Sequence, residues 1–130
     1  MTGINELTFY GSALTDIIVY SDNNDYASID GIVYNKDTST LICCPPARKS
    51  VSIPNHVTAI NDRAFWYCKA LTSATMPNTM TTIGKFAFFG CTTLTSITIP
   101  NSVTTICDYV FMQCYALETI ENQSEISQTS

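Results

Sequence analysis

The apolar positions of this chain recur with a fixed period of 23 residues. Three segments align without gaps, at residues 51–73, 74–96 and 97–119. Their apolar columns are Ile53/Met76/Ile99, Val57/Met80/Val103, Ile60/Ile83/Ile106, Ala64/Ala87/Val110, Phe65/Phe88/Phe111 and Leu71/Leu94/Leu117. Because a fixed period of this length marks a stacked repeat protein, in which neighbouring coils bury a shared core, these columns predict the core residues.

Each repeat contains one clear strand pattern. Apolar and polar residues alternate in LTSITIP at residues 94–100, as in a strand with one face inward and one outward. Pro54, Pro77 and Pro100 end the strand, because proline cannot donate to a sheet ladder, and the asparagine that follows favours a turn. Further along, an Ala-Phe pair followed by cysteine predicts a helical turn on the outer side. Each coil is therefore predicted to contain a strand, a turn and a short helix.

The segment before the repeats has a different pattern. Strand-forming residues at 32–34 and 41–42 flank a polar stretch at 35–39, which predicts a β-hairpin with an exposed tip. The length of 130 residues suits one domain. We expect a single repeat domain over 1–130, with an N-terminal repeat and hairpin insertion at 1–50, three repeats at 51–119 and a polar tail at 120–130.

The repeat resembles that of the BspA-like leucine-rich repeat family, whose motif reads IPxxVTxIxxxAFxxCxxLTSI. Residues 99–120 read IPNSVTTICDYVFMQCYALETI, and the resemblance extends from residue 14 onward, because the hairpin segment is similar to an insertion common in that family. Cys107 and Val110 depart from the motif. The resemblance implies an α/β leucine-rich-repeat solenoid, with parallel strands on the concave face and short helices or turns on the convex side. It also implies a surface-associated, adhesive protein without catalytic residues.

Charge and hydropathy exclude two classes of partner. The net charge is −5, and the six Lys and Arg residues are scattered, whereas binding of nucleic acid needs a basic stripe. No apolar run approaches the roughly 18 residues of a membrane helix, so no membrane insertion is predicted. The first residues lack the cationic and apolar segments of an export signal. The chain as given is therefore expected in the cytoplasm, or at the cell surface or secreted if it is a fragment of a longer family member.

Candidate chemistry is sparse. The one histidine, His56, occupies a variable turn position, and no Cys, Ser or carboxylate stands at a repeated spacing that would pair with it as a base. Nucleotide-binding and zinc-protease motifs are missing from the sequence. We therefore expect no enzyme, no catalytic residues and no cofactor.

The cysteines also have a structural interpretation. Cys68, Cys91 and Cys114 share one column, where parallel side chains cannot bridge well and an odd number cannot pair fully. We expect buried free thiols that pack as small hydrophobes. The alternative, a zinc site, needs four ligands and a CxxC-like spacing that the chain lacks. No metal site is predicted.

Two surfaces are candidates for binding a partner. The strands present polar, nearly uncharged positions outward, which would suit a flat protein or a carbohydrate, although β-propensity alone also explains them. The candidates on this face are Ser73, Thr75, Ser96 and Thr98. On the outer side, an apolar strip of Trp66, Phe89 and Met112 lies beside Phe86 and Tyr109. If exposed, this strip is an interface; the alternative is that its rings fold over the coil edge as packing.

The last coil suggests a third contact. Because a terminal strand edge needs a cap, a further repeat or a partner chain, pairing into a homo-oligomer through the C-terminal edge is possible. We therefore predict a non-enzymatic protein–protein interaction module of BspA-like surface or adhesion type. The alternative is a small acidic intracellular interaction or inhibitor protein that captures one macromolecular partner.

Overall fold

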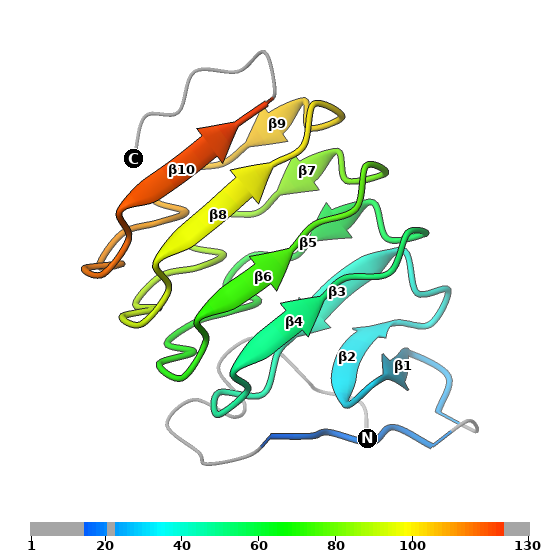
Figure 1. Cartoon of the computed structure of the whole chain (residues 1–130). Helices are drawn as coiled ribbons and strands as arrows, with labels where there is room; N and C mark the ends of the chain where they lie inside the picture. Colours follow the sequence, from blue (N-terminus) through cyan, green and yellow to red (C-terminus); the bar gives the residue numbers. More distant parts are fainter. Residues whose placement is uncertain (1–14, 21–22, 124–130) are drawn as a thin grey trace.

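The computed structural model describes residues 15–20 and 23–123, which wind into a solenoid of stacked coils (Figure 1). Each coil contributes one strand to a front layer, one strand to a rear layer and a row of turns that joins the two. The described residues contain no helix. The architecture is therefore a β-solenoid, with the parallel strands that the repeat predicted.

The front layer contains the strands that the alternating pattern predicted. These are β4 (Ser50–Ser52), β6 (Ser73–Thr75), β8 (Ser96–Ile99) and β10 (Thr119–Asn122) (Figure 1). β4 pairs with β6 and β8 pairs with β10, both parallel and both offset by one repeat, as in Ser50 opposite Ser73. Val51, Ala74 and Ile97 point inward and are buried.

A rear layer of shorter strands runs behind the first. It contains β3 (Thr40–Cys43), β5 (Ala59–Ile60), β7 (Thr82–Ile83) and β9 (Thr105–Ile106), which are parallel to one another. The sequence pattern did not indicate β5, β7 and β9, because two residues with one apolar side chain are too short to show alternation. The chain passes from front to rear layer through turns at the repeat prolines, as in the bond from the Val57 amide to the Pro54 carbonyl (3.2 Å).

The predicted hairpin is confirmed. β2 (Ile32–Asn35) pairs antiparallel with β3, and β1 (Tyr26–Ile29), which was not predicted, pairs antiparallel with β2. These strands extend the rear layer into a six-stranded sheet of order β1-β2-β3-β5-β7-β9. Both faces of β2 are buried, since Ile32 and Tyr34 join the main core while Val33 packs with Ile17 and Cys43 in a smaller second core.

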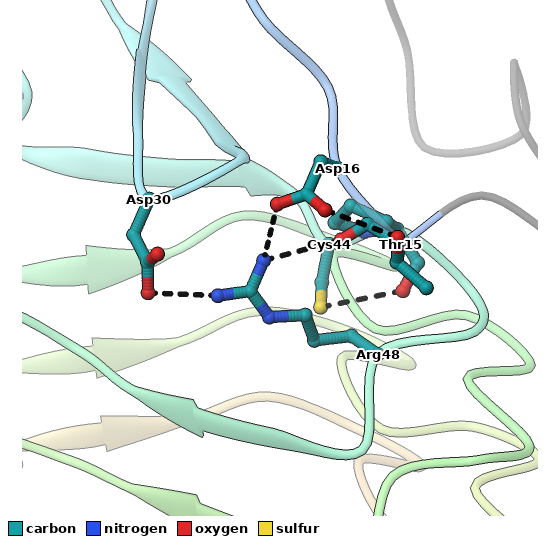
Figure 2. A network of polar contacts seen from close by, with 6 residues as sticks. Thr15, Asp16, Asp30, Cys44 and Arg48 are labelled. Carbon is teal, nitrogen blue, oxygen red and sulfur yellow. Dashed lines mark hydrogen bonds and ion pairs between the residues drawn. The ribbon is translucent and has the colours of Figure 1, made fainter.

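Ion pairs and a hydrogen bond of Arg48 join the N-terminal segment to the hairpin and the first coil (Figure 2). Its guanidinium lies 3.1 Å from Asp16 Oδ1 and 2.7 Å from Asp30 Oδ2, and donates to the Thr15 carbonyl at 3.1 Å. The Ile17 amide donates to the Gly31 carbonyl at 2.8 Å. Segment 15–17 therefore lies against the turn between β1 and β2 and closes this end of the solenoid.

The helices predicted for the outer side are wrong; consecutive turns stand in their place. The amides of Ala64, Trp66 and Cys68 each bond to the carbonyl three residues earlier. Arg63 and Tyr67 have positive φ angles, of 57° and 51°, and both columns repeat this conformation in the next two coils. A left-handed residue at every fourth position interrupts a right-handed helix, because L-residues adopt that region only singly.

Backbone bonds between coils replace the bonds of a helix along this row of turns. The amides of Arg63, Phe65 and Tyr67 donate to carbonyls of the next coil at 2.7–2.9 Å. The same amides in the second coil, those of Phe86, Phe88 and Gly90, repeat the pattern toward the third. The turns of neighbouring coils are therefore hydrogen-bonded to one another along the stack.

The phenylalanine column lies at the centre of the core. The rings of Phe65 and Phe88 stack with centroids 4.6 Å apart, and those of Phe88 and Phe111 lie 5.7 Å apart. Phe88 is fully buried between its two neighbours. This alignment of one side chain per coil confirms the 23-residue register.

Candidate functional site

The row of turns carries a second group of aromatic rings, on the outer side of the phenylalanine column. We call the rings of Trp66, Tyr67, Phe86, Phe89 and Tyr109, together with Met112 in the column of Trp66 and Phe89, the turn-side cluster. Two pairs stack along the columns: Trp66 lies over Phe89 with centroids 4.5 Å apart, and Phe86 lies over Tyr109 at 5.3 Å. The left-handed φ of Phe86 and Tyr109 sets the direction in which their column leaves the turns.

Edge contacts join these columns into one group. Phe86 meets Phe89 at right angles with centroids 5.6 Å apart, and Trp66 meets Phe86 at 5.9 Å. Tyr67 covers the other edge of Phe89 at 5.2 Å. Aromatic pairs in such geometries add about 0.5–1.5 kcal/mol beyond their buried area. The cluster is thus a packed structure rather than a set of separate surface rings.

The five residues that the sequence suggested as an outer-side interface differ in how far they are buried. Phe89 is 8% exposed, as in the alternative in which the rings fold over the coil edge as packing, because Trp66, Tyr67 and Phe86 close around it. Trp66 and Phe86 are half-buried. Tyr109 and Met112 are 44% and 42% exposed. Phe89 therefore supports the surface from beneath, and the other four reach solvent.

Three cations lie over these rings. The guanidinium carbon of Arg63 is 5.6 Å from the Trp66 ring centroid and 5.2 Å from that of Phe86. Lys69 and Lys85 lie over Tyr67 and Phe86, at 5.3 and 5.6 Å. Each distance falls within the range of cation–π attraction.

Tyr67 and the three cations were missed from sequence. Two signals could have found them. Arg63 occupies the same column as Phe86 and Tyr109, and Lys85 directly precedes Phe86. Both would have pointed to cations beside the rings.

The front layer presents a different surface. Ser73, Thr75, Ser96 and Thr98 are exposed, and their hydroxyl groups make no hydrogen bond to any described residue. Other hydroxyls in the repeats are used structurally, because Thr81 and Thr104 donate to carbonyls of the preceding coil at 3.1 and 3.3 Å. The four front-layer hydroxyls predicted from sequence are therefore free to contact a ligand.

The six cysteines are free thiols. The Cys91 thiol donates to the Phe65 carbonyl at 3.1 Å, and the Cys114 thiol donates to the Phe88 carbonyl at 3.0 Å. Cys44, which precedes Cys68 by one repeat plus one residue, extends the column, because the Cys68 thiol donates to the Cys44 carbonyl at 3.7 Å. The thiols thus bind carbonyls of the neighbouring coil.

The thiols differ in acidity. Hydrogen bonding with Cys44, together with burial, raises the pKa of Cys68 well above its usual value. Hydrogen bonding between Cys91 and Cys114 raises the pKa of Cys91, with burial adding to the rise, and lowers that of Cys114. Among Cys68, Cys91 and Cys114, the thiolate therefore forms first at Cys114.

Other chemical groups are scattered. His56 is exposed in the turn between β4 and β5. Across residues 15–20 and 23–123, no three His, Cys, Asp or Glu side chains gather where they could hold a metal ion. The same residues contain no helix long and apolar enough to cross a membrane.

The repeat sequence and the fold are both similar to those of known proteins. The family model described as the BspA type leucine rich repeat region matches residues 43–130, in six copies. A leucine-rich repeat protein from Eubacterium ventriosum is 31% identical in sequence, with a TM-score of 0.83 over 91% of this chain and 32% of its own. A leucine rich cell surface protein from Faecalibacterium prausnitzii is 22% identical, with a TM-score of 0.53 over 92% of this chain and 50% of its own.

The match is therefore to part of longer chains. This chain spans about a third of the first protein and half of the second. At 22% identity the second comparison shows a shared fold alone. Among curated proteins, none matches the chain significantly.

Proposed function

The chain belongs to the BspA-type leucine-rich repeat family, and from that membership we propose that it is a non-enzymatic module that binds another protein through the turn-side cluster. Leucine-rich repeats serve as scaffolds for protein interaction, because stacked coils offer long surfaces that vary without disturbing the core. The turn-side cluster lies on such a surface, since it stands outside the phenylalanine column and its columns hold different residues in the three repeats.

One observation carries the choice of surface: Trp66 and Phe86 lie half-buried under the guanidinium of Arg63. Trp, Tyr and Arg are the residues most enriched at energetic centres of protein interfaces, where a rigid ring loses little conformational entropy on binding. Here Phe89 holds Trp66 from beneath, so the ring is oriented before a partner arrives.

The charges at this surface indicate a partner with carboxylates. Arg63, Lys69 and Lys85 are three of the six basic residues in a chain of net charge −5, so half of its cations gather here. Asp62 and Asp108 occupy the same repeat column as Lys85, directly before the column of Arg63, Phe86 and Tyr109. A partner of mixed charge, with acidic groups over the rings, complements this arrangement.

The family resemblance favours an adhesive role at the cell surface. One structural relative is called a leucine rich cell surface protein, which supports the same setting. The alternative is a small acidic intracellular interaction or inhibitor protein, which the net charge of −5 and the length of 130 residues would suit. In both, the chain acts by binding.

A second surface has one observation in its favour. The free hydroxyls of Ser73, Thr75, Ser96 and Thr98 form two parallel columns on the front layer. A carbohydrate or a flat protein could accept and donate hydrogen bonds there. We rank this surface second, because small hydroxyl residues contribute little to interface affinity without an aromatic anchor.

The two surfaces can be separated by matched variants. Arg63→Ala with Trp66→Ala alters the turn-side cluster, and Ser73→Ala with Thr75→Ala alters the front layer of the adjoining coil. Each variant is compared with the unaltered chain in affinity capture from an extract of cell-surface proteins, followed by binding measurements with the purified candidate partner. We expect at least about a tenfold loss of affinity in the turn-side variant, as for an interface centre of 1.4 kcal/mol or more.

The circular dichroism spectrum and the midpoint of urea unfolding must first show that both variants are folded. Binding retained by the turn-side variant but lost by the front-layer variant would move the function to the hydroxyl columns. Binding that neither variant alters would contradict both surfaces.

A further inference from the structure

The thiol column of the stack has a direction, because each thiol reaches back toward the coil before it. The column contains Cys44, Cys68, Cys91 and Cys114. The Cys91 thiol donates to the Phe65 carbonyl at 3.1 Å, and the Cys68 amide donates to the same carbonyl at 3.2 Å. The sulfur of one coil therefore shares an acceptor with the backbone of the cysteine in the coil before it.

The same contact joins Cys114 to Cys91. The Cys114 thiol donates to the Phe88 carbonyl at 3.0 Å, and the Cys91 amide donates to that carbonyl at 3.2 Å. The two side chains also form a hydrogen bond with one another. Neighbouring parallel strands lie about 4.8 Å apart, and disulfides join Cα atoms that are about 4.4–6.8 Å apart. The spacing of the coils therefore allows a bond between Cys91 and Cys114.

We propose that Cys91 and Cys114 form a peroxide-sensitive thiol pair, which closes into a disulfide between the second and third repeats. Cys114 is half-buried, whereas Cys44, Cys68 and Cys91 are buried, so a small oxidant reaches Cys114 first. Cys91 is the thiol toward which Cys114 leans. The column holds four thiols, not only the three that share the repeat spacing, so it can divide into two pairs. The buried pair of Cys44 and Cys68 then remains reduced.

The oxidant is a hydroperoxide, and the reaction balances with one equivalent of hydrogen peroxide. The Cys114 thiolate attacks one peroxide oxygen, the O–O bond breaks, and the hydroxide that leaves takes up a proton to become water. Cys114 is then a sulfenic acid. The Cys91 thiol turns away from the Phe65 carbonyl, gives up its proton and attacks the Cys114 sulfur, and the S–O bond breaks with loss of a second water. Two thiols are oxidised to one disulfide while the peroxide is reduced.

The acidity of the two thiols supports this order of steps. Hydrogen bonding with Cys91 lowers the pKa of Cys114, which favours the thiolate that the first step needs. The pKa of Cys91 is raised by the same hydrogen bond and by burial, so Cys91 reacts second, once a sulfenic acid stands beside it.

The disulfide would lie beside the turn-side cluster. Cys91 follows Gly90, next to which the Tyr67 ring lies, and Cys114 follows Gln113, which accepts a hydrogen bond from the Tyr67 hydroxyl. The bond would therefore fix the distance between the two coils that Tyr67 contacts. The inference stands independently of the binding proposed for the cluster, since it concerns a covalent bond between coils.

Oxidation of the reduced 130-residue chain by hydrogen peroxide tests the proposal. Timed samples are alkylated in denaturant and digested with chymotrypsin, whose cleavage after Leu94 and Tyr109 separates Cys91, Cys107 and Cys114. We expect mass spectrometry to show a linked Cys91–Cys114 peptide that dithiothreitol separates. Free thiol should disappear at these two residues at least about tenfold faster than at Cys68.

Two variants serve as controls. In Cys91→Ser, Cys114 is expected to stop at the sulfenic acid, which dimedone traps, because no thiol stands beside it to displace water. Cys107→Ser removes a half-buried thiol outside the column and should leave formation of the Cys91–Cys114 bond unchanged. Circular dichroism must show that each protein is folded before and after oxidation.

Trapped sulfenic acid at Cys114 of the folded, unaltered chain, with Cys91 still a thiol, would overturn the proposal. A bond from Cys114 to Cys107, or to a second chain as seen by non-reducing electrophoresis, would also contradict it. If the Cys91→Ser variant does not fold, the linked peptide of the unaltered chain still decides.

Discussion

The ring of Tyr67 lies directly over Gly90 in the next coil. A Cβ atom on residue 90 would stand 2.8 Å from Tyr67 Cδ1, and Gly90 has a φ of 73°. Tyr67 continues past this point, and its hydroxyl donates to Gln113 Oε1 at 3.3 Å, two repeats along the chain. One ring thus links three successive coils across a position where only glycine leaves enough room.

Gly90→Ala is therefore expected to destabilise the protein, by more than about 1 kcal/mol, because both the backbone conformation and the ring oppose a methyl group. Urea unfolding followed by circular dichroism measures the loss. The double variant Tyr67→Ala with Gly90→Ala should be less destabilised than the sum of its single variants, since the first change removes the clash. Strict additivity would mean that the ring imposes no constraint on residue 90.

Phe88→Ala tests the central column. Phe88 is fully buried between two stacked rings, so we expect a loss of about 3–5 kcal/mol in the free energy of unfolding. Phe111→Ala is the matched comparison and should cost less, because Phe111 has one ring neighbour among the described residues. A loss below about 1 kcal/mol for Phe88→Ala would be inconsistent with its place in the core.

The thiols offer a kinetic test of the cysteine column. In the native protein at pH 7.5, iodoacetamide should modify Cys114 faster than Cys91, because Cys114 is partly exposed and its pKa is lowered. Cys68 and Cys91 should be slowest, since both are buried with raised pKa values. Mass spectrometry of timed samples gives the order of modification.

Denatured protein without reductant serves as the control for this labelling, and all six thiols should then react. Preferential native labelling of Cys68 or Cys91 would show that the column is open to solvent. Fewer than six reactive thiols after denaturation would indicate a disulfide.

The ionisation of the Tyr34 side chain should make the stability of the protein depend on pH in the alkaline range. Burial, with smaller effects from Cys44 and Asp30, raises the pKa of Tyr34 from 10.0 to about 12. Between pH 10 and pH 12 the unfolded chain loses the Tyr34 proton while the folded chain keeps it. The contribution of Tyr34 to the free energy of unfolding is therefore complete below pH 10 and is lost as the pH rises to 12. The loss should reach about 2 kcal/mol.

Tyr34→Phe keeps the ring and removes the ionisation. Urea unfolding between pH 9 and pH 11.5 should therefore show a smaller decline for this variant than for the unaltered chain. Identical declines would mean that Tyr34 ionises equally easily in the folded and unfolded states.

The sequence predicted the front layer and core well because both depend on side-chain periodicity. Ile97 and Ile99 alternate with Ser96 and Thr98, and a single spacing aligned Phe65 with Phe88. The outer side was harder. An Ala-Phe pair with a later cysteine has the same spacing in a helix and in consecutive turns, and the choice depends on backbone bonds to a neighbouring coil.

The candidate surface was predicted in part for a similar reason. Column membership correctly grouped Trp66 with Phe89 and Phe86 with Tyr109. It could not show that neighbouring columns lean together and bury Phe89, because that depends on the left-handed conformation of Phe86 and on the reach of Tyr67. The front-layer hydroxyls were easier to place, since outward positions of a strand follow from alternation alone.

The backbone bonds between coils also determine how the molecule would respond to force. They run from one coil to the next, and the two ends of the described chain lie at opposite ends of the stack (Figure 1). Because each coil is held mainly by its nearest neighbours, tension between these ends would load one interface at a time. The protein would then unfold and lengthen under tension in steps of one repeat, rather than in a single event.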